Sequence, residues 1–116
     1  AQDRGDLDQA EDWYRQSLAI EEDLNNRPGM ASTYRQLGLL AEERGDPRQA
    51  LAWTIRCITL FDTFPHPATE PAPHHLQRLT HQLGTPTLHA LWHTTTGHPL
   101  PPHIETHATH DENENP

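Results

Sequence analysis

The chain has 116 residues, enough for one domain, and only 33% of them are hydrophobic. Eight arginines, no lysine and seventeen acidic residues give a formal net charge of -9, which disfavours binding to nucleic-acid phosphates. The sequence has no apolar run near the roughly 18 residues of a membrane span, and its first residues lack the pattern of a signal peptide, so we expect a cytoplasmic protein without a membrane contact. Its single cysteine cannot form a disulfide within the chain.

The sequence repeats itself at an offset of 40 residues. Residues 1–10 align with residues 41–50, and the Ala, Arg, Gly, Asp, Gln and Ala at six of these positions are identical. Further along, Trp13 matches Trp53. A fixed period of this length is typical of proteins built from stacked helical repeats.

The repeated block predicts a helix end, a tight turn and a helix start. Gly5 and Gly45 can adopt the left-handed conformation that closes a helix. Asp6 and Asp46 are residue types that accept hydrogen bonds from the first backbone N–H groups of the next helix. Pro47 suits the first helical position, where its missing N–H is not needed.

Three helices are predicted in this part of the chain, over residues 7–25, 28–44 and 47–62, and no strand. Each shows apolar or small residues at helical spacing along one face. In chain order these faces comprise Leu7, Ala10, Tyr14, Ser17 and Leu18; Ala31, Tyr34, Leu37, Gly38 and Ala41; and Ala50, Thr54, Cys57, Ile58 and Phe61.

The packing residues resemble the tetratricopeptide repeat (TPR) family. The pattern Tyr34-x2-Leu37-Gly38-x2-Ala41, followed by Ala50 and Cys57, is similar to that of a complete repeat, and Ala10-x3-Tyr14 is similar to part of a preceding one. Thr54, Asp62 and the 40-residue period depart from the family pattern. The resemblance covers about residues 1–64 and implies an all-α fold of antiparallel helix hairpins, an α-solenoid fragment, in which Gly38 and Ala50 let two helices approach closely.

The alignment of position 1 with Ala41 leaves the first repeat without most of its leading helix. We therefore expect the C-terminal fragment of a longer solenoid, with about one and a half repeats. The helix over 7–25 then lacks a partner on one side, and its exposed face is a candidate surface for homodimer formation.

The composition changes after Phe64, where all ten histidines and most of the prolines lie. Residues 65–73 are predicted to be a proline-rich linker and residues 97–116 a disordered tail. Residues 74–96 are predicted to form two helices. This pair resembles the capping helices that follow TPR arrays in large bacterial signalling and regulatory proteins.

The resemblance also implies a binding surface, because leading helices of TPR proteins line a groove that holds a partner's peptide or helix. Carried over by position, its residues are Ser32, Arg35, Gln36, Leu39, Glu42 and Glu43. Glu42 and Glu43 would repel an acidic peptide end, so we expect a protein or peptide partner of basic or apolar character. This function, a protein–protein interaction module, requires no cofactor.

The sequence contains no recognisable catalytic motif, so we expect that this protein is not an enzyme. His89 and His93 share one helical face, and His81 could approach them, which makes the three weak candidates for a metal or pH-responsive site. Ala90 stands where a zinc protease needs its glutamate. Ten histidines in one chain make such a spacing unremarkable, and we expect no metal.

Overall fold

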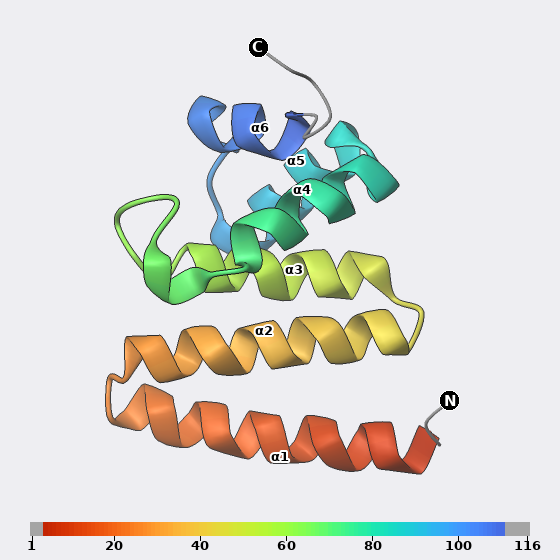
Figure 1. Cartoon of the computed structure of the whole chain (residues 1–116), viewed down its shortest axis with the longest axis vertical. Coiled ribbons are helices and arrows are strands. Elements are labelled where there is room, and N and C mark those ends of the chain that lie inside the picture. The colour runs from red at the N-terminus through yellow and green to blue at the C-terminus, as the bar shows by residue number, and fades with distance from the viewer. Residues whose placement is uncertain (1–3, 111–116) are drawn as a thin grey trace.

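Six α-helices and one short 3-10 helix form the part of the chain that the computed structural model describes, residues 4–110 (Figure 1). No strand occurs in these residues, so the predicted all-α fold is confirmed. The elements in chain order are α1 (Arg4–Asp23), α2 (Arg27–Glu43), α3 (Pro47–Ile58), η1 (Pro67–Thr69), α4 (Ala72–Leu83), α5 (Thr85–Thr96) and α6 (Pro102–Thr109).

The first three helices lie side by side, each antiparallel to the next, as Figure 1 shows from the bottom upwards. Helices α4 and α5 pack on α3, and α6 packs on α4. The most extensive helix contact joins α2 to α3. The described residues therefore form one stack of helices, in which α1 is covered by α2 on one side only.

The turn between α2 and α3 has the predicted chemistry. Gly45 has φ +79, and the Asp46 side chain accepts a hydrogen bond from the Gln49 backbone N–H at 3.1 Å. The same prediction is wrong for Gly5 and Asp6, which lie inside the first turn of α1. The described residues contain no earlier helix that would have to end at Gly5. Helix α1 begins at Arg4, before the glycine, whereas α3 begins at Pro47, after Gly45.

The hairpin of α2 and α3 is closely packed around a small-residue contact and an aromatic one. A Cβ atom at Gly38 would lie 3.6 Å from the Ala50 carbonyl oxygen, so the two helices pack against each other at this position at ordinary contact distance. The Tyr34 and Trp53 rings stack with their centroids 5.7 Å apart. Trp53 is consequently only 5% exposed and is part of the main apolar core.

The third helix is shorter than predicted, because it ends at Ile58 instead of residue 62. The Thr59 hydroxyl donates to the Ile55 carbonyl oxygen at 2.9 Å at this end. Phe61 then leaves the helix and stacks on His66, with the ring centroids 4.0 Å apart. The predicted linker over 65–73 is thus partly ordered by η1 and by the first residues of α4.

The prediction of a disordered tail over 97–116 is wrong for α6. Its face carries Ile104 and Ala108, which are buried together with Leu100. The Gln77 side-chain amide on α4 donates to the His110 carbonyl oxygen at 2.6 Å, at the end of α6. Spacing by four residues places these apolar side chains on one face, and α4 supplies the surface that covers them. The remaining tail, residues 111–116, lies outside the described residues.

Candidate functional site

A hollow of about 680 Å³ opens where α1, α2 and α4 meet. It contains four of the six residues predicted for the groove face, and three further side chains from α1 and α4 that the sequence did not indicate. Its lining residues are Ala10, Tyr14, Gln36, Leu39, Leu40, Glu42, Glu43 and Arg78. We call this hollow the α2 groove.

The α2 groove owes its apolar floor to the amphipathic pattern of α2. Residues 36, 39 and 43 lie on the outward face of this helix, whereas Leu37 and Leu40 point to its packed side and are buried. Leu39 is 43% exposed, which is unusual for a leucine in the middle of a helix. Tyr14 is partly buried and packs against the core beside it. The floor can therefore accept an apolar side chain from outside.

One end of the α2 groove is closed by an ion pair between α2 and α4. The Arg78 guanidinium donates to Glu42 through Nη1 at 2.6 Å and through Nη2 at 2.8 Å. These hydrogen bonds hold the pKa of the Glu42 carboxyl below its usual value, and they raise the pKa of Arg78. Arg78 Nη2 also lies 3.0 Å from His75 Nδ1, and burial is the main reason that the pKa of His75 is lowered.

This pairing changes the charge expected for the α2 groove. From the sequence, both Glu42 and Glu43 are expected to repel an acidic partner. Glu42 is neutralised by Arg78, whereas Glu43 is exposed and makes no ion pair within residues 4–110. The negative charge that the groove offers to a partner is therefore carried by Glu43.

Two of the predicted groove residues, Ser32 and Arg35, do not line the α2 groove. Both are half-buried on α2. The Arg35 Nε atom is buried and has no hydrogen-bond partner among the described residues. Its guanidinium is close enough to Cys57 and His75 to influence their pKa values, so it faces the neighbouring helices.

The lining residues outside the predicted groove face are Ala10, Tyr14, Leu40 and Arg78. Ala10 and Tyr14 belong to the apolar face predicted for the first helix, and in the structure they also line the groove. Arg78 had a signal of its own, because it is the only arginine after Arg56. Its pairing with Glu42 depends on how α4 packs on α3, which no local sequence pattern predicts.

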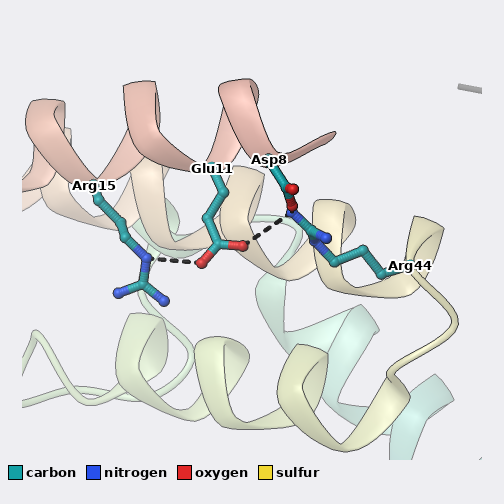
Figure 2. A network of polar contacts seen from close by, with 4 residues as sticks. All are labelled: Asp8, Glu11, Arg15 and Arg44. Atoms are coloured by element: carbon teal, nitrogen blue, oxygen red, sulfur yellow. Dashed lines mark hydrogen bonds and ion pairs between the residues drawn. The ribbon is translucent and has the colours of Figure 1, made fainter. Parts of the chain in front are cut away.

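A second polar cluster joins α1 to the end of α2 on the neighbouring face (Figure 2). Arg44 Nη2 lies 2.7 Å from an Asp8 oxygen and 3.2 Å from a Glu11 oxygen, and Arg15 Nε lies 2.8 Å from the other Glu11 oxygen. Positive and negative side chains alternate along the cluster. Because these side chains are partly solvated, each pair contributes about 1 kcal/mol of stability, and together they hold α1 against the end of α2.

The structure does not bring His81, His89 and His93 together as a metal site. His81 Nε2 lies 3.1 Å from the His110 carbonyl oxygen, and His89 Nε2 lies 3.3 Å from a Glu105 oxygen. His93 is exposed on α5. Within residues 4–110, no group of three or more His, Cys, Asp or Glu side chains could hold a metal ion.

None of the helices in the described part of the chain is both long enough and apolar enough to cross a bilayer. The longest, α1, carries many acidic residues.

These antiparallel hairpins, with an open groove on one of the leading helices, define a helical-repeat scaffold. The family model described as tetratricopeptide repeat matches residues 1–62, which is more than half of the chain. The chain therefore belongs to the tetratricopeptide repeat family. Searches of curated proteins and of solved structures found no similar protein in either set.

Proposed function

We propose that this chain is a protein–protein interaction module that holds a segment of its partner in the α2 groove. TPR domains generally bind proteins or peptides, and the chain belongs to that family. The observation that carries the proposal is the exposed Leu39 on an apolar floor, inside a hollow of about 680 Å³. This volume lies within the range of about 300–1,000 Å³ that is usual for ligand pockets.

The chemistry of the groove favours a partner segment with an apolar side chain next to a basic one. The apolar side chain would cover Leu39 and Tyr14, and the basic one would meet the Glu43 carboxylate. Removing Leu39 from water supplies most of the affinity, and the charge pair supplies selectivity against acidic segments.

The test is a selection of peptides from a random decapeptide display library on the immobilised chain. We expect the selected peptides to combine Leu, Ile, Phe or Trp with a neighbouring Arg or Lys. Leu39→Ser should weaken their binding by about tenfold or more, since it removes the apolar floor. Leu24→Ser is the matched control, because Leu24 is an exposed leucine outside the groove.

Glu43→Arg tests the charge preference separately. This substitution should shift the selected peptides from basic to acidic without changing their apolar residue. Selection of acidic peptides by the parent chain, or equal binding by the Leu39 and Leu24 variants, would contradict the proposal.

A second role, self-association, is favoured by the open face of α1. Trp13 and Ile20 lie on one face of α1 and are 67% and 61% exposed, and Leu24, directly after the helix, is 72% exposed. Three side chains cover less than the roughly 800 Å² per partner of a standard interface, so the dimer would be weak. Sedimentation should show concentration-dependent dimers of the parent and only monomers of Ile20→Glu. A parent that stays monomeric at millimolar concentration removes this role.

The wider setting follows from the family resemblance alone. We propose that the module works in the cytoplasm as part of a larger bacterial signalling or regulatory protein, in which α4 and α5 cap the repeat array.

A further inference from the structure

A second hollow, of about 500 Å³, lies between the α2–α3 hairpin and the α5 region. It shares no residue with the α2 groove. Tyr34, Arg56 and Leu60 contribute to one wall, and Trp92, Thr95 and Pro99 contribute to the other. We call it the α3–α5 hollow. It joins residues of the TPR match to residues beyond it, so the repeat pattern alone does not describe it.

The lining of the α3–α5 hollow contains an arginine and no acidic side chain. The chain has a formal net charge of -9, yet no Asp or Glu lines this hollow. Arg56 is the charged side chain in the lining, and it pairs with no carboxylate within residues 4–110. An anion entering the hollow would thus meet a guanidinium without having to displace another acid.

The Arg56 guanidinium is also held in place. Its central carbon lies 5.1 Å from the centroid of the Trp53 ring, in a cation–π contact. Stacking on a ring engages one face of a guanidinium and leaves its edge N–H groups available, and these are the groups that bind a carboxylate in two parallel hydrogen bonds. The contact with Trp53 therefore leaves the edge of the Arg56 guanidinium available to an anion in the hollow that Arg56 lines.

Two hydroxyl groups in the lining are without a partner in the described chain. Tyr34 is 8% exposed and its phenol makes no hydrogen bond there, and the phenol oxygen itself is reached by solvent, because it is not among the buried atoms without a partner. Burial, and secondly the charge of Glu22, raise its pKa. A tyrosine phenol is protonated at neutral pH in any case and can donate a hydrogen bond. The Thr95 hydroxyl is likewise unused, whereas that of Thr96 donates to the Trp92 carbonyl oxygen at 2.8 Å.

The rest of the lining is apolar. Trp92 is buried and lines the hollow, and Leu60 is partly buried against the core. Pro99 adds a rigid apolar edge. An aromatic or branched aliphatic group placed between these side chains would be removed from water on two sides.

We propose that the α3–α5 hollow binds a small carboxylate carried on an aromatic or branched apolar body. The carboxylate pairs with Arg56 and accepts a hydrogen bond from the Tyr34 phenol. The apolar body rests on Trp92 and Leu60. The site is separate from the α2 groove, so the proposal of carboxylate binding does not depend on the proposal of peptide binding.

The experiment uses the full chain with N-acetylphenylalanine as the probe and N-acetylphenylalaninamide as its uncharged match. Both have the same aromatic body, so the difference between them reports the carboxylate. In ¹H–¹⁵N NMR titrations we expect the Trp92 indole and Thr95 amide signals to move with the acid. The amide should bind about tenfold more weakly, the ratio expected for one charge-assisted hydrogen-bonded pair.

Variants assign the carboxylate contact. Arg56→Gln should weaken binding of the acid about tenfold and leave the amide unchanged, whereas Arg48→Gln, at the other end of α3 and outside the lining, should change neither. Tyr34→Phe keeps the stacked ring and should weaken the acid by a few-fold. Because Arg56→Gln also removes the contact with Trp53, Thr95→Glu is a second variant, which places a repelling charge in the hollow without touching Trp53.

Any of three results would overturn the proposal. The first is equal binding of acid and amide by the parent. The second is acid binding that survives both Arg56→Gln and Thr95→Glu. The third is the absence of signal movement around Trp92 at millimolar probe, including the case in which the signals around Leu39 move instead.

Discussion

Arg78 on α4 binds Glu42 on α2 through two parallel hydrogen bonds, of 2.6 and 2.8 Å, across 36 residues of sequence. Two hydrogen bonds between a guanidinium and a carboxylate fix the relative orientation of both groups as well as attracting them. Glu42 lies within the residues that match the TPR family, and Arg78 lies beyond them. This pair therefore attaches the C-terminal helices to the repeat and closes one end of the α2 groove.

The stability contributed by this pair should depend on pH. The pKa of folded Glu42 is below the usual 4.5, so its stabilisation is present above that value and is lost as the pH falls through the lowered pKa. Glu42→Gln should lower the free energy of unfolding by about 1 kcal/mol near pH 7, because both side chains are partly solvated. Urea unfolding near pH 7 and near pH 3 should show the difference shrinking in acid. Glu43→Gln should have no effect at either pH, and a gap that widens in acid would contradict the assignment.

The two tryptophans of the repeat should differ sharply in their contribution to stability. Trp53 is 5% exposed and Trp13 is 67% exposed, although they occupy the same repeat position. Trp53→Ala should cost about 3–5 kcal/mol because it empties a packed site, whereas Trp13→Ala should change stability by less than about 0.5 kcal/mol. Urea unfolding followed by circular dichroism measures both. Similar losses would mean that Trp13 is also covered.

The glycines of the α2–α3 hairpin should respond to alanine with opposite signs. At Gly38 a Cβ would meet its nearest atoms at 3.6 Å or more, an ordinary contact, so Gly38→Ala should be neutral or stabilise by up to about 1 kcal/mol through helix propensity. Gly45 has φ +79, and Gly45→Ala should destabilise by about 1 kcal/mol. Thermal unfolding midpoints compare the two, and a large loss at Gly38 would show that the hairpin is tighter than described.

Cys57 should be unreactive while the chain is folded. Its side chain is fully buried, its Sγ lies 3.5 Å from the Ala31 carbonyl oxygen, and burial raises its pKa to about 12. Reaction with an aromatic disulfide reagent near pH 8 should therefore be slow in buffer and fast in urea. The urea dependence of the rate should follow the unfolding transition measured by circular dichroism. Rapid reaction of the folded chain would contradict the burial of this thiol.

The helices of the repeat could be predicted closely because their signals are local. Gly45 ends α2 and Asp46 begins α3, each through contacts within a few residues. The end of α3 and the existence of α6 were predicted less well. Residues 102–109 have the proline and histidine content of a disordered tail, and their order comes from burying Ile104 against α4.

The α2 groove was predictable only in part, for a related reason. Leu39 and Glu43 could be placed on an outward face from helical periodicity. Arg35 has the same polar character, but α3 and α4 approach it and leave its Nε buried. The neutralisation of Glu42 depends on Arg78, whose position is set by the linker and by the packing of α4 on α3.

By itself, the sequence determined the helices of the α2–α3 hairpin with the turn between them, the 40-residue repeat and the family, because caps, periodicity and small-residue spacing act within one or two helical turns. Only the tertiary structure decided that Trp53 is buried and Trp13 exposed, that Glu42 is paired, and that a carboxylate-free hollow forms between α3 and α5. Burial and ion pairing are properties of surfaces brought together from distant parts of the chain, so identical residues in a repeat acquire different roles according to which helix covers them.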